Sequence, residues 1–123
     1  SPDGLTPETR AWGDTATAAA FGADARRGYA ALAPDSTHFD AAMTKILAMW
    51  RTQPDFTPAE LGRITARTLV CAGGHDVILR AHTEALARAI PGAQLWIVPG
   101  ASHGAMLEQP DLVNRKVLEF LAR

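Results

Sequence analysis

Two short apolar runs, separated by a segment with helical periodicity, constrain the fold of this chain most strongly. Residues 67–72 and residues 94–98 are mostly apolar, with Leu69 to Ala72 in the first run and Leu95 to Val98 in the second, and each run ends at a turn signal that contains glycine. Residues 79–90, between the two runs, repeat their apolar side chains with the period of a helix. Strand, helix and strand in this order predict a βαβ unit with parallel strands, and therefore an α/β fold.

The residues before this unit are predicted to be helical. Pro7 follows a capping threonine, so one interrupted helix or two short helices are expected from there through Tyr29. Thr37 and Asp40 resemble a capping box at the start of the most regular helix. The apolar face of that helix is expected to contain Phe39, Ala42, Met43, Ile46, Leu47 and Trp50. A further short helix is predicted after Thr57, which precedes a proline and an acidic residue.

We divide the chain into a helical segment, residues 1–64, and an α/β segment, residues 65–123, which ends in a helix after Pro110. One stripe of that last helix is expected to contain Val113, Val117, Phe120 and Leu121. Two strands make a small sheet with unpaired edges, and the first methionine is Met43. We therefore expect either a missing N-terminal half or self-association.

Charge and composition exclude several classes of protein. Twelve Lys and Arg residues against 13 Asp and Glu residues give a net charge of −1, and the basic residues are scattered, which argues against nucleic acid as a partner. No apolar run is long enough for a membrane span and no signal peptide is recognisable, so we expect a soluble, cytoplasmic protein. The single Cys71 is expected to pack as a small apolar residue in a buried strand.

The loops that follow the two predicted strands contain the candidate chemistry. Asp76 follows the first strand and His103 follows the second. Because neighbouring parallel strands lie about 4.8 Å apart and end at the same edge of the sheet, these side chains are expected to meet there. An aspartate that accepts a hydrogen bond from one imidazole nitrogen leaves the other nitrogen free as a general base for a hydroxyl nucleophile.

The sequence in this region resembles the C-terminal part of an α/β-hydrolase. The similar stretches are ITARTLVCAGGHDVI, which contains the Gly73 to Asp76 loop, and IPGAQLWIVPGASHGAMLEQPDLVNRKVLEFL, which contains Leu107 to Pro110. The resemblance implies that Asp76 is the acid and His103 the base of a Ser-His-Asp triad, that the upstream helices form a cap, and that no cofactor is needed. The implied activity is hydrolysis of a carboxylic ester or similar acyl bond in a small molecule.

One part of the family pattern is missing. No Gly-x-Ser-x-Gly elbow precedes Asp76, so the nucleophile is expected to lie outside this chain, and the chain alone is expected to be inactive. Residues 100–104 do spell Gly-x-Ser-x-Gly around Ser102. No histidine follows His103, however, so the family order of serine, acid and histidine makes Ser102 a decoy.

Other interpretations stay open. Met49 and Trp50 either line an acyl or aromatic substrate pocket or pack in the core, and their helical spacing favours the core. A second interpretation is a metal site with ligands from His75, His82, His103 and Asp76, although no metal-binding spacing supports it. In a third, the chain is a truncated homologue or one half of a split protein that acts as a non-enzymatic interaction module.

Overall fold

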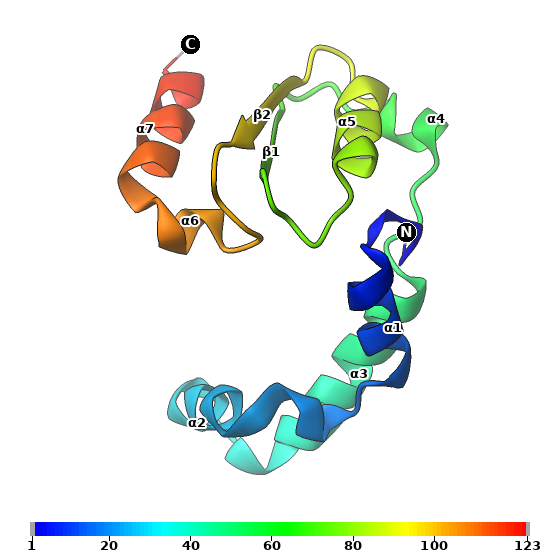
Figure 1. Ribbon diagram of the computed structural model, residues 1–123, viewed down its shortest axis with the longest axis vertical. Coiled ribbons are helices and arrows are strands. Elements are labelled where there is room, and N and C mark those ends of the chain that lie inside the picture. Colours follow the sequence, from blue (N-terminus) through cyan, green and yellow to red (C-terminus); the bar gives the residue numbers. More distant parts are fainter. Residues whose placement is uncertain (1, 123) are drawn as a thin grey trace. The chain divides into compact units, whose positions relative to one another are not determined.

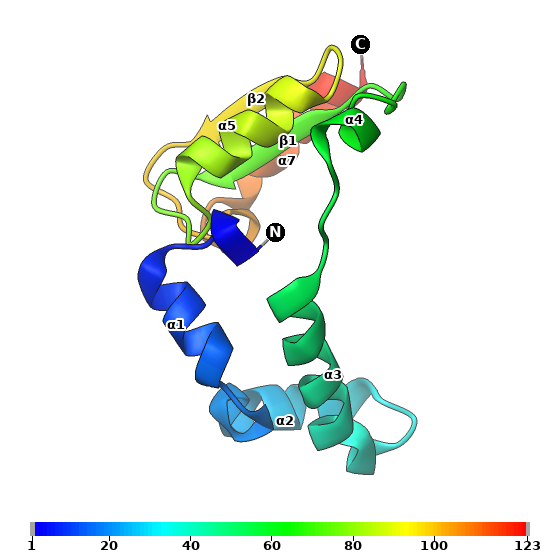
Figure 2. The same cartoon turned by 90° about the vertical axis from the view of Figure 1, so that its right-hand side faces the viewer.

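The computed structural model describes residues 2–122, and the chain divides into two compact units. Pro7–Asp55 make up most of the first unit, and the second contains Gly4–Thr6 together with the residues from Phe56 onward. Figures 1 and 2 show that the first of these is entirely helical, whereas the second contains the sheet. That residues 1–64 form a cap and residues 65–123 a core segment stays a prediction.

The helical unit contains α1 (Pro7–Thr15), α2 (Gly22–Leu32) and α3 (Phe39–Thr52), with 3-10 turns before α2 and α3. The sequence predicted either one interrupted helix or two short helices from Pro7 through Tyr29, and the structure has two separate helices there. Phe39 and Leu47, at 1% and 2% exposure, are buried on the inner face of α3. Arg51 of α3 donates hydrogen bonds to the carbonyls of Gly13 and Ala16, at 2.9 and 2.8 Å, and so holds the end of α1 against α3.

Two sequence predictions for α3 are wrong. The capping box of Thr37 and Asp40 does not form, because the Asp35 side chain accepts hydrogen bonds from both the amide and the hydroxyl of Thr37 and caps a 3-10 turn instead. Met49 and Trp50 do not pack in the core: their exposed fractions are 47% and 44%. The buried stripe of α3 contains Phe39 and Leu47 and does not extend to the last turn.

The second unit is built on a two-stranded parallel sheet. Its elements are α4 (Pro58–Leu61), β1 (Leu69–Gly73), α5 (Arg80–Ala89), β2 (Gln94–Val98), α6 (Ala105–Glu108) and α7 (Pro110–Leu121). β1 and β2 pair from Leu69 opposite Gln94 to Gly73 opposite Val98, which confirms the predicted parallel βαβ unit. Thr57 begins α4 with a complete capping box, as its sequence predicted.

The helices of this unit cover opposite faces of the sheet. Val70 of β1 packs with Ala87 and Ile90 at the end of α5. Val98 of β2 packs with the residues that follow it and with Leu112 on α7. Because Val70 and Val98 are an odd number of residues apart in the paired register, they point to opposite faces. Figure 1 shows α5 beside β1 and α7 on the side of β2.

This arrangement overturns one further prediction and part of another. Cys71 is exposed rather than buried, because α7 packs over β2 and leaves this face of β1 uncovered. On α7 the predicted stripe is only partly the packed one. Val113, which belongs to that stripe, packs with Leu112 against the sheet, whereas Val117 and Leu121 are 37% and 66% exposed.

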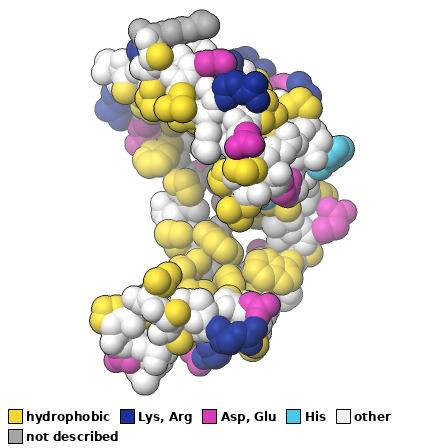
Figure 3. Space-filling model, turned by 90° about the vertical axis from the view of Figure 1, so that its left-hand side faces the viewer, with side chains coloured by type: hydrophobic (Ala, Val, Ile, Leu, Met, Phe, Trp, Pro, Cys, Tyr) yellow, Lys and Arg dark blue, Asp and Glu magenta, His cyan; other side chains and the backbone are white. Residues whose placement is uncertain are grey.

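Large apolar side chains lie on the surface of both units (Figure 3). Those at least three-fifths exposed in the described residues are Leu32, Phe56, Met106, Leu107, Leu118 and Leu121. Within residues 2–122, no helix has the combination of length and apolar character that crossing a membrane requires.

Candidate active site

The loops that follow β1 and β2 lie against each other at one edge of the sheet. The amide of Gly74 donates to the carbonyl of Val98 at 2.9 Å, and the amide of His75 donates to the carbonyl of Ala101 at 2.9 Å. These bonds continue the parallel pairing beyond the ends of the strands. The residues at the tips of the two loops are therefore brought together by backbone contacts, as the sequence predicted.

Gly73 makes this close approach possible. A Cβ atom at Gly73 would lie 2.1 Å from the carbonyl oxygen of Ser102 and 2.5 Å from that of Ala101. Both neighbours are backbone atoms, which cannot move aside as the end of a flexible side chain can. A residue without a side chain is therefore required where the first strand passes the second loop.

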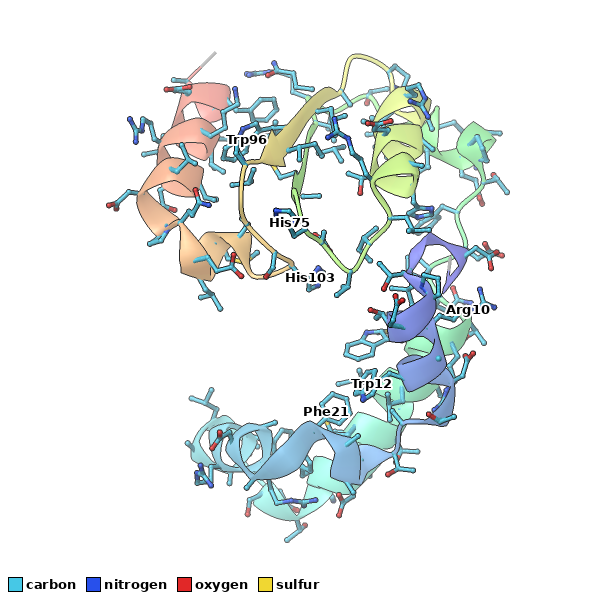
Figure 4. The ribbon with its side chains drawn as sticks, in the orientation of Figure 1. Arg10, Trp12, Phe21, His75, Trp96 and His103 are labelled. Carbon is cyan, nitrogen blue, oxygen red and sulfur yellow. The ribbon has the colours of Figure 1, made fainter. Side chains whose placement is uncertain are left out.

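Asp76 and His103 form a hydrogen-bonded pair across these loops. Nδ1 of His103 lies 2.8 Å from Oδ1 of Asp76. The Asp76 side chain is only 7% exposed, whereas that of His103 is 67% exposed, and Figure 4 shows His103 at the open end of its loop. The same Asp76 oxygen also accepts a hydrogen bond of 2.9 Å from the amide of Ile78.

This geometry sets the tautomer of the imidazole. A carboxylate can only accept, so the proton of neutral His103 resides on Nδ1 and the lone pair of Nε2 is free. In this tautomer, Nε2 is the nitrogen that can accept a proton from a hydroxyl group. A buried acid that orients a solvent-facing base is the arrangement that nucleophilic hydrolysis requires.

Glu108 stabilises the loop that contains His103 through hydrogen bonds, a role that the sequence did not reveal. Its carboxylate accepts hydrogen bonds from the Ser102 hydroxyl and, at 2.8 Å, from the Ser102 amide. The Ser102 oxygen in turn accepts a bond of 3.3 Å from the amide of Gly104. The residues on both sides of His103 are thus held together. The hydroxyl bond and the amide bond from Ser102 lower the pKa of Glu108 below its ordinary value of 4.5.

Met49 and Trp50, the predicted substrate-binding residues, lie in the helical unit. The rings of Trp50 and Phe21 are 6.0 Å apart between centroids, and those of Phe21 and Trp12 are 6.1 Å apart. Figure 4 shows Trp12 and Phe21 beside each other. Sequence reasoning missed these two partners, because they lie on other segments of the chain. A substrate-binding role for Met49 and Trp50 stays a prediction.

The candidate metal ligands do not come together. Among residues 2–122, no three or more histidine, cysteine, aspartate or glutamate side chains form a group that could hold a metal ion.

Comparisons with known proteins give the same fold. A 2-hydroxy-6-oxononadienedioate/2-hydroxy-6-oxononatrienedioate hydrolase from Klebsiella pneumoniae is 39% identical over 88 residues, which cover 70% of this chain and 30% of the relative. Carboxylesterase YbfK from Bacillus subtilis is 38% identical over 68 residues, 54% of this chain and 23% of the relative. The chain thus spans less than a third of the length of these curated relatives.

The crystal structure of a serine hydrolase involved in carbazole degradation matches 76% of this chain and 37% of that one, with a TM-score of 0.63 and 22% identity. At this identity the match supports the fold alone. The sequence profile described as "Alpha/beta hydrolase family" matches residues 1–116. With nearly its whole length matched by that profile, and hydrolases among its relatives, this chain belongs to the alpha/beta hydrolase family.

Proposed function

We infer that Asp76 and His103 are the acid and the base of a Ser-His-Asp triad that hydrolyses a carboxylic ester or a similar acyl bond in a small molecule. The observation that carries this proposal is the 2.8 Å contact between Nδ1 of His103 and the largely buried Asp76 carboxylate. It leaves Nε2 as the only free basic nitrogen of the ring. The hydrolases among the relatives of the chain support the same reaction class.

In the proposed reaction, Nε2 of His103 takes the proton of a serine hydroxyl as its oxygen attacks the substrate carbonyl. The tetrahedral intermediate collapses, and the imidazolium returns that proton to the departing alcohol. His103 then removes a proton from water, which attacks the acyl-serine ester, and the carboxylic acid leaves as the serine regains its proton. Asp76 remains ionised and stabilises the imidazolium in both steps.

The nucleophile of this proposal is a serine outside residues 1–123. Ser102 is poorly suited to be the nucleophile, because its hydroxyl donates to Glu108 and because it directly precedes the proposed base, His103, in the chain. The fraction of the curated relatives that the chain spans supports the proposal that further segments complete the enzyme. Residues 1–64 are the proposed cap, and Met49 and Trp50 are proposed to contact the substrate there.

The test uses the polypeptide expressed from the complete reading frame, with p-nitrophenyl acetate as substrate. We expect His103→Ala and Asp76→Asn each to lower kcat by about 10³-fold or more, as loss of a triad member does in other enzymes. His38→Ala, which removes an exposed histidine of the helical unit, is the matched control and should retain full activity. Full activity in the His103→Ala variant would refute the proposal.

The chain of residues 1–123 provides an independent test of where the nucleophile lies. Incubation with a fluorophosphonate probe, which reacts with activated serines, should leave the intact mass of this chain unchanged. Stoichiometric labelling at Ser102, located by peptide mass spectrometry, would contradict the external nucleophile.

A further inference from the structure

Gly4–Thr6 do not fold with the helical unit that they immediately precede. They belong to the second unit, where Leu5 forms an antiparallel bridge with Ile78 in the loop between β1 and α5. The Thr6 amide donates to the carbonyl of Val77 at 2.8 Å, and the Leu79 amide donates to the carbonyl of Gly4 at 2.7 Å. Figure 2 shows this dark blue segment beside that loop. We call Gly4–Thr6 the N-terminal clamp.

The clamped loop contains the amide that holds the candidate acid. Ile78 lies between the two residues bonded to the clamp, and its amide donates to Oδ1 of Asp76 at 2.9 Å. The same oxygen accepts from Nδ1 of His103. With the backbone fixed on both sides of Ile78, the direction of its N–H group is fixed as well. The peptide group between Val77 and Ile78 thus accepts a hydrogen bond from the clamp through its carbonyl and donates one to the Asp76 carboxylate through its amide.

Gly4 also packs against the first helical turn after this loop. Gly4 is buried, and a Cβ atom there would lie 2.5 Å from two ring carbons of His82 on α5. The clamp therefore lies directly on the His82 ring, and the close approach requires glycine at position 4. Three independent contacts thus fix the clamp: the two hydrogen bonds to the loop and the packing on α5.

We propose that the N-terminal clamp is a positioning element for Asp76, which it holds in register with His103 through the Ile78 amide. Its catalytic consequence rests on the proposed function, whereas its effect on the geometry of the pair does not. Displacement of Ile78 redirects the bond to Oδ1, and the carboxylate then no longer meets Nδ1 of His103 in line. Misplacement of a catalytic group by about 1 Å can cost about 10²-fold in rate.

The first experiment removes one clamp bond in the 123-residue chain. Leu79 has φ −56°, which fits proline, so Leu79→Pro keeps the φ angle, removes the amide that donates to Gly4 and places its Cδ against the Gly4 carbonyl, which displaces the clamp. Leu79→Ala is the matched control, because it shortens the same side chain and keeps the amide. The measurement is the proton NMR resonance of the hydrogen-bonded Nδ1–H of His103. We expect this resonance to be lost or shifted upfield in Leu79→Pro and retained in Leu79→Ala.

The second experiment changes the other side of the clamp. Gly4→Ala places its methyl group against the His82 ring, and we expect the same loss of the Nδ1–H resonance. The double variant Gly4→Ala/His82→Ala removes the ring that causes the overlap and should restore the resonance. An unchanged resonance in both Leu79→Pro and Gly4→Ala would overturn the proposal, and so would failure of the double variant to restore it.

A destabilised control variant distinguishes positioning of Asp76 by the clamp from a general effect of the clamp on stability. Ile90→Ala removes a buried side chain from the cluster at the opposite end of α5, so it lowers the melting temperature and should leave the Nδ1–H resonance in place. If Ile90→Ala abolishes the resonance as Leu79→Pro does, the effect reflects general stability and the proposal is wrong.

In the enzyme from the complete reading frame, Gly4→Ala should lower kcat about 10²-fold with little change in KM, since the clamp acts on the base and not on substrate binding. The two proposals fail differently. If His103→Ala is fully active, the proposed function is wrong, whereas an altered Nδ1–H resonance in Leu79→Pro still supports the clamp. If His103→Ala is inactive while Gly4→Ala has full activity and a normal resonance, the clamp is wrong.

Discussion

At the scale of single residues, Glu108 determines how rigidly the proposed base is held. Its carboxylate accepts from both the hydroxyl and the amide of Ser102, the residue before His103. The Gly104 amide, on the other side of His103, donates to the same hydroxyl oxygen. These contacts close a small ring of hydrogen bonds around the histidine, and their strength depends on a negative charge on Glu108.

This dependence predicts a pH effect on stability. Because the folded-state pKa of Glu108 is lower than its ordinary value of 4.5, the Ser102 bonds contribute fully above that pH and are lost as the pH falls through the folded-state value. Glu108→Gln should therefore be less stable than the wild type near neutral pH, and the difference should shrink as the pH falls below 4.5. Urea unfolding over a series of pH values measures this difference, and a constant difference would contradict the role of the charge.

The two residues of the candidate pair were predictable from sequence, but Glu108 and the aromatic partners were not. Asp76 and His103 lie in the loops that directly follow β1 and β2, and the parallel pairing of these strands brings their ends together. Glu108 reaches Ser102 because the single helical turn α6 brings its carboxylate back to that residue, and a helix of four residues is too short for a periodic pattern to reveal. The exposure of Met49 and Trp50 depends on which helices cover α3, which periodicity cannot specify.

At the scale of elements, the contact between β1 and the histidine loop depends on the absence of a side chain at one position. Gly73→Ala should lower the free energy of unfolding by about 1–3 kcal/mol, because its methyl group overlaps two backbone carbonyls. It should also weaken the hydrogen bond from the His75 amide to Ala101. Denaturant unfolding and amide exchange of His75 measure the two effects.

Gly74→Ala is the matched control for this prediction. A Cβ atom at Gly74 would lie 3.4 Å from the nearest heavy atom, the carbonyl oxygen of Val98, which is close to ordinary contact. Its effect on stability should therefore be small. Equal destabilisation by the two substitutions would show that the loss reflects glycine content and not the close approach at Gly73.

In the helical unit, Arg51 joins α3 to the end of α1. Its Nε and Nη2 donate to the carbonyls of Gly13 and Ala16 from two separate nitrogens of one planar group, a geometry that the single nitrogen of a lysine ammonium group does not reproduce. Arg51→Lys should therefore destabilise the helical unit by roughly 1 kcal/mol. Faster amide exchange in α1, with unchanged exchange in β1 and β2, is the expected result. Uniform acceleration in both units would contradict a local role.

Helix starts that depend on a local motif were predicted better than the faces that helices bury. The capping box at Thr57 forms as predicted, since all of its bonds lie within four residues. At Thr37 a competing acid, Asp35, takes the threonine amide, and sequence alone does not rank the two. For α7, several apolar stripes are possible, and the position of β2 selects the one that contains Leu112 and Val113.

At the scale of the whole molecule, the open strand edges and the exposed apolar residues are surfaces on which another chain or segment could pack. Among the described residues, each strand of the sheet has a single neighbour, and α7 exposes Leu118 and Leu121, each at 66%. Such edges and patches are interaction sites in stable proteins. The two expectations from sequence, a missing N-terminal half and self-association, would each cover these edges, and both stay predictions.

For the 123-residue chain on its own, we predict self-association that increases with concentration, because no other partner is then present to pair the edge of β1. Light scattering coupled to size-exclusion chromatography, under reducing conditions, should give a mass above that of one chain. Cys71→Lys places a charge on the exposed face of β1 and should weaken the association, since lysine in an edge strand opposes pairing with another strand. Cys71→Ser removes the same thiol without adding charge and should behave as the wild type. A stable monomer at every accessible concentration would refute the prediction. Association that Cys71→Lys does not weaken would show that the contact lies away from the edge of β1. The variant Leu118→Glu would then test whether the exposed apolar face of α7 forms that contact.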